Sequence, residues 1–131
     1  EQLLYRESGL LGLSGVSADM RDVEAAGTEA SERAIAYFVA RAQREIGGLT
    51  AVLGGLDALV FCGGIGENSA RIRASIVDGL SYLGLAIDPD ANARNATDIS
   101  VGPTPVLVIR TSEEEVIAEA ALRLTAGQGE A

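Results

Sequence analysis

The sequence predicts an α/β domain built on a parallel β-sheet, and three observations lead to this fold class. Two short apolar runs, 57–62 and 105–109, are bounded by glycine or proline and are typical of strands buried on both faces of a parallel sheet. Amphipathic segments alternate with them in the order helix, strand, helix, strand, helix. Because two strands cannot bury both of their faces and both of their edges, we expect an incomplete parallel sheet with flanking helices, part of a larger sheet.

The amino-terminal half is expected to contain one long helix. Residues 1–27 are rich in glycine and serine and predict an ordered loop with short turns. A helix is expected over 28–48, with Thr28 as its N-cap and apolar side chains at helical spacing. The glycine pair at 47–48 is expected to end this helix, with a further short helical piece over 49–53.

In the carboxy-terminal half, predicted helices alternate with the two predicted strands. A second amphipathic helix is expected over 66–83, with Gly84 capping its end. Residues 86–103 contain proline, asparagine and glycine and predict an irregular connection to the second strand. A last helix is expected over 112–125, where a threonine or serine followed by glutamates offers a capping box.

Composition and charge narrow the class of function. The chain has 131 residues, enough for one small domain, and a net charge of −9 with no histidine. All ten basic residues are arginines, and an acidic chain without a basic patch is a poor binder of nucleic acid. Without histidine, a bound metal ion is expected to have oxygen ligands, which favours Mg²⁺ or Ca²⁺. No apolar stretch reaches the length of a membrane span.

Three single residues are given structural rather than chemical roles. Cys62 is the one cysteine, which fits a reducing compartment such as the cytoplasm, and it is expected to be a small core residue. Arg71 and Arg73 are expected on the solvent side of the second helix, with the alternative that Arg73 points into a cleft.

The segment 63–69, GGIGENS, is the first candidate ligand site. It follows one predicted strand and precedes a helix, where glycines permit close approach of a ligand and helix amides are free to bind it. Its spacing matches neither the dinucleotide-binding glycine pattern nor the phosphate loop, which requires lysine. A tight turn between strand and helix explains the same residues, so both readings stay open.

Two further segments carry charged side chains in places where a ligand could reach them. In 17–24, SADMRDVE, the acid and the arginine form either a surface ion pair or a nucleotide contact, since arginine stacks on flat rings. In 111–115, TSEEE, the acids either stabilise the first turn of a helix or approach a phosphate-bound Mg²⁺.

Taken together, these segments resemble the C-terminal portion of the acetokinase family. Four stretches carry the resemblance in matching order and spacing: 7–15, 19–24, 53–68 and 105–114. The family lies within the superfamily of sugar kinases, heat-shock protein 70 and actin. The resemblance therefore implies a ribonuclease H-like ATPase domain, with residues 1–131 forming the C-terminal part of its second, nucleotide-binding domain.

The resemblance also implies a reaction and a set of site residues. The family phosphorylates acetate with ATP, reversibly and with Mg²⁺, to give acetyl phosphate and ADP, and it is commonly homodimeric. Carried over by position, the nucleotide contacts are Asp19, Met20 and Arg21. The adenosine pocket is Gly64, Ile65, Gly66, Glu67 and Asn68, with both glycines contacting adenosine through their backbone. Glu113 is the carboxylate associated with Mg²⁺.

The resemblance is incomplete in ways that bear on function. Ser112 stands where the family usually has asparagine, and Cys62 stands where a small residue is usual. The family's phosphate loop, catalytic aspartate, transition-state histidine and arginine, and acetate pocket all lie before residue 1. No catalytic residue is therefore assigned within this chain. A kinase for propionate or butyrate and an inactive nucleotide-binding remnant remain as alternatives, although 19–24 looks more like acetate and propionate kinases.

Overall fold

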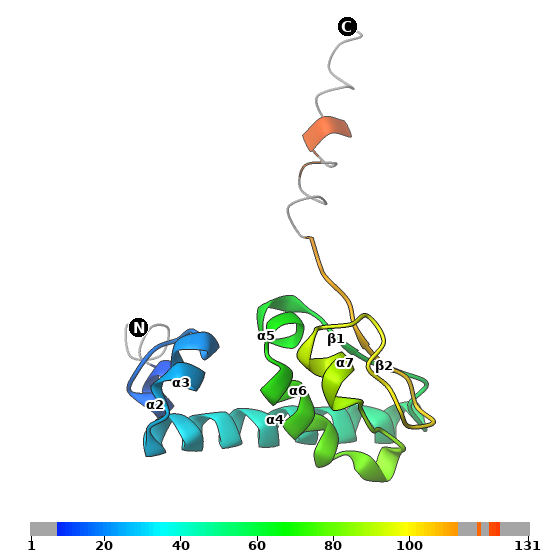
Figure 1. The fold of residues 1–131 in the computed structure, drawn as a ribbon, viewed down its shortest axis with the longest axis horizontal. Helices are drawn as coiled ribbons and strands as arrows, with labels where there is room; N and C mark the ends of the chain where they lie inside the picture. Colours follow the sequence, from blue (N-terminus) through cyan, green and yellow to red (C-terminus); the bar gives the residue numbers. More distant parts are fainter. Residues whose placement is uncertain (1–7, 113–117, 119–120, 124–131) are drawn as a thin grey trace, which may run out of the picture.

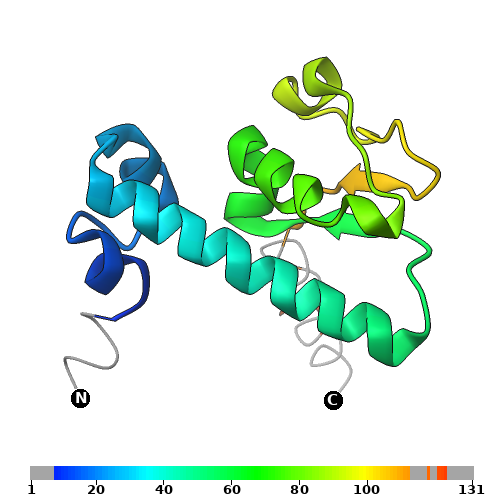
Figure 2. The same cartoon turned by 90° about the horizontal axis from the view of Figure 1, so that it is seen from below.

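A single long helix, α4 (Glu29–Leu53), forms the base of the fold in the computed structural model, which describes residues 8–112, 118 and 121–123. Figure 1 shows α2 (Gly9–Ser14) and α3 (Met20–Ala26) over the amino-terminal end of α4. The strands and the remaining helices lie farther along α4 (Figure 2). The predicted loop over 1–27 is wrong for its described part, which contains two short helices.

The amino terminus of α4 forms as predicted. Thr28 is the N-cap, and its side chain accepts a hydrogen bond from the backbone N–H of Ser31 at 3.1 Å. Ser31 returns the contact by accepting from the backbone N–H of Thr28 at 2.8 Å, which completes a capping box. Glu29 and Glu32 stand in the first turn, where the helix dipole favours acids.

The predicted end of α4 at the glycine pair is wrong. The helix continues through Gly47 and Gly48 and ends at Gly54, whose φ of 76° provides the left-handed cap. An interior glycine costs a helix about 1 kcal/mol, and tertiary packing offsets that cost here. A Cβ at Gly47 would lie 3.1 Å from the hydroxyl of Tyr82, so the glycine allows the 3₁₀ helix η1 (Ser81–Leu83) to approach closely.

The sheet has two parallel strands in the described part of the chain, as predicted. Strand β1 (Leu59–Phe61) pairs with β2 (Val106–Val108) in the register Leu59 to Val106 and Phe61 to Val108. Both strands are shorter than the apolar runs that predicted them. Residues 97–99 add antiparallel bridging along β2, with the N–H of Ile99 donating to the carbonyl of Val106 at 3.0 Å.

Among the described residues only one face of this sheet is buried, whereas both faces were expected to be. The side chains of Leu59 and Phe61 are 9% and 8% exposed, whereas Val60 between them is 46% exposed. Because successive side chains of a strand point to opposite faces, Cys62 falls on the same side as Val60 and is exposed. The expectation that Cys62 is a core residue is therefore wrong.

The predicted helix over 66–83 is three pieces: α5 (Gly63–Asn68), α6 (Ala70–Asp78) and η1. Ser69 separates the first two, and its side chain caps α6 by accepting from the N–H of Ile72 at 3.1 Å. A short helix, α7 (Pro89–Ala93), lies within the connection predicted as irregular. Most of the expected last helix lies outside the described residues.

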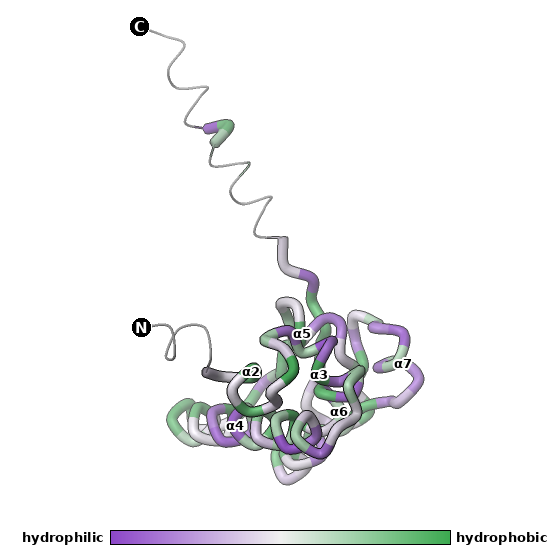
Figure 3. The backbone as a smooth tube through the Cα atoms, turned by 90° about the vertical axis from the view of Figure 1, so that its left-hand side faces the viewer, coloured by the Kyte–Doolittle hydropathy of each residue, from purple (hydrophilic) through white to green (hydrophobic). Residues whose placement is uncertain are grey.

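The hydrophobic core lies between α4, α6 and the covered face of the sheet. Its larger aliphatic and aromatic members include Ile35, Val39, Leu59, Phe61, Ile72, Ile76, Leu80, Ile99, Val106 and Val108, and the core extends to Met20 and Val23 of α3. In Figure 3, where α4 is seen nearly end-on, this helix carries both hydrophilic and hydrophobic residues, as expected for a helix with one covered face. Within the described ranges, no helix is long and apolar enough to cross a membrane.

Candidate functional site

A cavity of about 630 Å³ lies between α3 and α5. Its walls come from two segments far apart in the sequence, and they are formed by Ala18, Asp19, Met20, Arg21, Glu24, Gly64, Ile65, Asn68 and Ser69. Six of the eight residues expected to contact a nucleotide are in this set. The fold thus brings together two motifs that the sequence offered separately, in a space of the size that ligand sites usually have.

The α3 side of the cavity is ordered by Asp19. This residue is the N-cap of α3, and its Oδ1 accepts from the backbone N–H of Arg21 at 2.9 Å. The Arg21 guanidinium also donates to the carboxylate, with Nη2 and Oδ2 2.5 Å apart. These hydrogen bonds from Arg21 lower the pKa of Asp19 to about 2, so the carboxylate is ionised at neutral pH.

The two remaining α3 residues of the predicted motif differ in exposure. Met20 is 3% exposed and belongs to the core while also contributing to the cavity wall. The side chain of Arg21 is 83% exposed, and the residue is part of the cavity lining. A guanidinium can stack on an aromatic ring or pair with an anion.

The residues predicted to form the adenosine pocket fall into two groups, those that line the α5 side of the cavity and those that do not. Gly64, Ile65 and Asn68 line the cavity, and a Cβ added to Gly64 would meet no atom within 4 Å. The carboxamide of Asn68 donates to the backbone carbonyl of Gly64 at 2.8 Å. Gly64 therefore leaves open space where a side chain would otherwise project, which suits close approach of a ligand to the backbone.

Gly66 and Glu67 do not line this cavity. A Cβ on Gly66 would stand 3.3 Å from the backbone carbon of Phe61, so this glycine allows α5 to pack on β1. Glu67 Oε1 accepts from the backbone N–H groups of Gly63 and Thr111 at 2.9 and 2.8 Å. The segment expected to lie between the strand and the helix is itself a short helix, and the N–H of Gly63 in its first turn is already bonded to Glu67.

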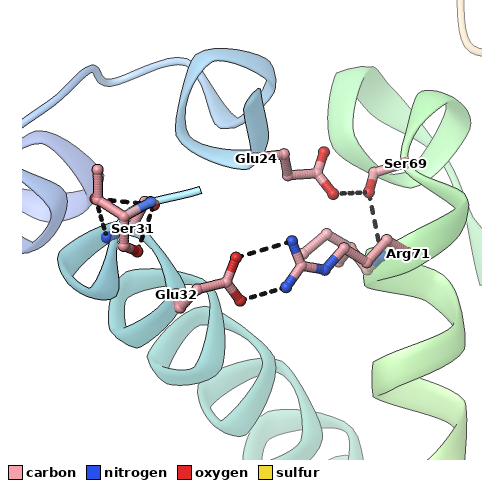
Figure 4. Close-up of polar contacts among 7 residues, drawn as sticks. Glu24, Ser31, Glu32, Ser69 and Arg71 are labelled. Atoms are coloured by element: carbon pink, nitrogen blue, oxygen red, sulfur yellow. Dashed lines mark hydrogen bonds and ion pairs between the residues drawn. The ribbon is translucent and has the colours of Figure 1, made fainter. Parts of the chain in front are cut away.

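Two contacts hold α3 and α4 against α6 beside the cavity (Figure 4). The hydroxyl of Ser69 donates to Glu24 Oε1 at 2.7 Å. Arg71 forms an ion pair with Glu32 of α4, which lowers the pKa of that carboxyl. These pairs join residues that are 45 and 39 positions apart in the sequence, so they connect the α3 and α4 side of the fold to the start of α6.

Glu24 and Ser69 line the cavity, and sequence reasoning did not select them. Both fall inside the motifs that were recognised, at 17–24 and 63–69. Glu24 is one helical turn beyond Arg21, and Ser69 is one turn beyond Ile65. Had residues 20–26 been predicted as a helix rather than a loop, the 3.6-residue period would have placed Glu24 on the same face as Arg21. Ser69 lay within the helix predicted over 66–83, and that helix was predicted to begin too late to relate it to Ile65.

Arg73 is buried, which contradicts its expected place on the solvent side of α6. It is 0% exposed, and burial lowers the pKa of its guanidinium. Its nitrogens donate to Asn92 Oδ1 at 2.7 Å, to the Gly66 carbonyl at 2.8 Å and to Asn95 Oδ1 at 2.6 Å. Sequence spacing does not reveal this role, because the acceptors belong to α5 and to the region of α7.

A metal ion held by protein ligands alone does not fit the described residues, in which no group of three acidic, histidine or cysteine side chains is close enough to bind one. Mg²⁺ is commonly bound by one or two carboxylates together with substrate phosphates and water. A single carboxylate at the carboxyl end of β2 suits that arrangement. Glu113, the expected carboxylate, lies outside the described residues.

Solved structures with the same fold define the class of this protein. The chain superposes on acetate kinase from Porphyromonas gingivalis with a TM-score of 0.82 and 32% identity, covering 95% of this chain and 33% of that one. Acetate kinase from Entamoeba histolytica gives a TM-score of 0.83 and 30% identity, over 92% and 34% of the two chains. The parallel sheet and its helices therefore have the α/β fold of the actin, sugar-kinase and heat-shock protein 70 superfamily.

The chain belongs to the acetokinase family, whose profile matches residues 1–119. It is 55% identical over 124 residues to acetate kinase from Methylocella silvestris, covering 93% of this chain and 31% of that protein. It is 52% identical over 128 residues to propionate kinase from Citrobacter freundii, covering 94% and 32%. The chain thus spans about a third of the length of the curated relatives that it matches.

Proposed function

We propose that this chain is the C-terminal, nucleotide-binding part of a kinase that transfers phosphate reversibly between ATP and acetate, giving acetyl phosphate and ADP. One observation carries the proposal. Six of the eight residues expected to contact a nucleotide, in two segments of the sequence, line a single cavity at the carboxyl edge of a parallel sheet. In open α/β sheets, ligands commonly bind at that edge.

In this proposal the chain holds and orients the nucleotide. The exposed guanidinium of Arg21 stacks on or pairs with the nucleotide, and Asp19 holds that guanidinium in place through the contacts described above. Gly64 allows the ligand to approach the α5 backbone. Mg²⁺, when bound, would neutralise phosphate charge, and Glu113 is the residue of this chain proposed to associate with it.

We do not assign a catalytic base or acid within the described residues. Phosphoryl transfer depends mainly on positioning and on stabilising charge in the transition state. We propose that the groups acting on the acid substrate and the transferred phosphoryl belong to the part of the relatives that this chain does not span. The full-length kinase is the protein in which the proposal can be tested.

A preference for propionate is the second candidate function. Relatives named propionate kinases are 51% and 52% identical to this chain, close to the 55% of an acetate kinase. Comparing kcat/KM for acetate, propionate and butyrate in the full-length kinase separates these possibilities. We expect acetate and propionate to be used in preference to butyrate.

We propose a cytoplasmic homodimer as the working form. The exposed thiol of Cys62 suits a reducing compartment, where it stays free. Leu49, Val52 and Leu53 near the end of α4 are 62%, 85% and 75% exposed, an apolar surface suited to covering by protein. Light scattering of the full-length kinase gives the oligomeric state directly.

The nucleotide proposal is tested by a matched pair of arginine variants in the full-length kinase. Arg21 and Arg33 are both exposed and both paired with a carboxylate, but only Arg21 lines the cavity. We expect Arg21→Ala to raise the Kd for ATP at least about tenfold, equivalent to about 1.4 kcal/mol. Arg33→Ala should leave it unchanged. Equal calorimetric affinities for the two variants would remove α3 from the nucleotide site.

A further inference from the structure

Glu24 brings a half-buried carboxylate to the wall of the cavity between α3 and α5. Its Oε1 accepts from the hydroxyl of Ser69 at 2.7 Å, and the Ser69 oxygen in turn accepts from the N–H of Ile72 at 3.1 Å (Figure 4). Ser69 is 8% exposed and caps α6, so its hydroxyl holds Glu24 from a fixed place. In the described part of the chain, no donor is bonded to the second oxygen, Glu24 Oε2.

Glu24 differs from the other charged residues that line this cavity. Asp19 and Arg21 neutralise each other, because both oxygens of the Asp19 carboxylate accept from the Arg21 guanidinium. Within the described ranges, Glu24 has a hydroxyl partner but no ion-pair partner. The cavity therefore presents one uncompensated carboxylate, and an ionised carboxylate can only accept hydrogen bonds. A ligand that lies beside Glu24 must supply a donor.

The surroundings of Glu24 suit the nucleoside end of a nucleotide. Met20 lines the cavity from α3 and Ile65 lines it from α5, so apolar side chains stand on both walls. A flat ring that enters between them is removed from water favourably, while the few polar groups of such a site set its orientation. Phosphates have the same sign of charge as Glu24 and are repelled by it, whereas an amino group on the ring is attracted.

We infer that Glu24 is a specificity-determining residue that accepts a hydrogen bond from the exocyclic amino group of adenine and thereby selects adenine nucleotides. The inference rests on the proposed function, in which this cavity binds ATP. It adds a residue that reads the base, a role that the sequence resemblance did not assign. The exocyclic group of adenine is a donor, whereas a purine with a carbonyl oxygen in its place presents an acceptor to the carboxylate. Ser69 holds Glu24 in position for the contact.

Three diphosphates that differ at this ring position test the contact by calorimetry in the full-length kinase. ADP carries the amino group, purine riboside diphosphate lacks it, and inosine diphosphate carries a carbonyl oxygen there. The variants are Glu24→Ala and Glu24→Gln, with Glu32→Ala as the control. Glu32 is also a glutamate that accepts from the start of α6, through Arg71, but it does not line the cavity.

We expect the wild type to bind ADP at least about tenfold more tightly than purine riboside diphosphate, because the latter leaves Glu24 without a donor. In Glu24→Ala this preference should fall below about threefold through a loss of ADP affinity. Glu32→Ala should keep the wild-type preference. Glu24→Gln should shift the preference from ADP toward inosine diphosphate, because its oxygen stays with Ser69 and its amide N–H can donate to the carbonyl.

The ratio of the two affinities separates base recognition from a structural role. A change that only disturbs the fold weakens ADP and purine riboside diphosphate together, so a wild-type ratio in Glu24→Ala would overturn the inference. Contact with a ribose hydroxyl would also leave that ratio unchanged, and the loss in Glu24→Ala would then be absent for deoxyribose ADP. A wild type that binds ADP and purine riboside diphosphate equally would overturn the inference without any variant. If Glu24→Ala does not fold, the isosteric Glu24→Gln carries the same comparison.

Failure of the proposed function gives a different pattern. If the wild type does not bind ADP, or if Arg21→Ala leaves the affinity for ATP unchanged, the nucleotide site at α3 is refuted and the inference with it. If Arg21→Ala weakens ATP binding while Glu24→Ala keeps the wild-type base preference, the inference alone is refuted.

Discussion

The guanidinium of Arg73, which is fully buried, donates a hydrogen bond to the backbone carbonyl of Gly66 over 2.8 Å. This contact joins α6 to α5, while two further nitrogens of Arg73 donate to oxygens of Asn92 and Asn95. The described residues give Arg73 no carboxylate partner, so its charge is compensated by neutral oxygens alone. A cavity wall built on α5 therefore depends on a cation in the core.

Removing Arg73 should destabilise the fold strongly. Arg73→Ala leaves several buried acceptors without donors, and each such group costs about 1–3 kcal/mol. Arg71, two residues away, is exposed and paired with Glu32, an arrangement that usually contributes little. We expect Arg73→Ala to lower the free energy of unfolding by more than about 3 kcal/mol and Arg71→Ala to have a much smaller effect. Urea denaturation of the full-length kinase measures both, and similar losses would contradict the buried role of Arg73.

The two glycines of α5 should respond differently to a side chain. Gly64→Val places its side chain in open space at the cavity wall and should raise the Kd for ATP at least about tenfold with little change in melting temperature. Gly66→Val presses on Phe61 and should destabilise the fold by about 1–3 kcal/mol, harming nucleotide and acid binding together. Calorimetry beside a melting curve separates these outcomes. Unchanged ATP affinity in a folded Gly64→Val protein would exclude α5 from the nucleotide site.

The charge of Asp19 should stabilise the fold over most of the pH range. Its folded-state pKa is about 2, below the ordinary value of 3.8, because Arg21 donates to the ionised carboxylate. A depressed folded-state pKa contributes stability that is complete above the unfolded-state pKa and is lost as the pH falls toward 2. Asp19→Asn retains an N-cap but loses the charge. The stability difference between wild type and variant should be constant above about pH 5 and shrink below pH 3.8. Urea unfolding at a series of pH values measures this, and a difference that grows on acidification would contradict it.

The glutamates of the segment 113–115 should not be equivalent in the full-length kinase. Glu113→Ala should raise the Mg²⁺ concentration needed for half-maximal activity far more than Glu115→Ala, because Glu113 is nearest the strand end. Glu115 is expected to serve the helix cap, whose loss costs about 0.5–2 kcal/mol of stability. Kinetics across a Mg²⁺ titration decide the matter. Equal effects would mean that Glu113 only stabilises the helix dipole.

The chain expressed alone should not form acetyl phosphate from acetate and Mg-ATP. It spans about a third of its relatives, and we assign no catalytic group within its described residues. Positioning of the nucleotide by itself does not supply the charge stabilisation that phosphoryl transfer requires. A coupled assay of acetyl phosphate formation, with the full-length kinase as the positive control, is the measurement. Turnover above background that disappears in Gly64→Val would show that the chain is active by itself.

Several features of the fold and the site follow from local sequence. The two apolar runs predicted the parallel strands, and Thr28 marked the start of α4, because both depend on side chains within a few residues. The motifs at 17–24 and 63–69 pointed to the residues of one cavity. Their order and spacing were sufficient to indicate the acetokinase family.

Other features were decided only by tertiary contacts. Gly47 lies within α4 rather than at its end, and the absence of a side chain there leaves room for Tyr82. Arg73 is buried because it donates hydrogen bonds to acceptors up to 22 residues away in the sequence. Gly66 and Glu67 do not line the cavity, because Gly66 packs against Phe61 and Glu67 accepts a hydrogen bond from Thr111. A sequence motif names the residues of a segment, but the direction each side chain faces is set by packing and hydrogen bonds with segments distant in the chain. The sequence therefore determined which segments build the cavity that we propose binds the nucleotide, and the tertiary structure decided which residues within them line it and which support it.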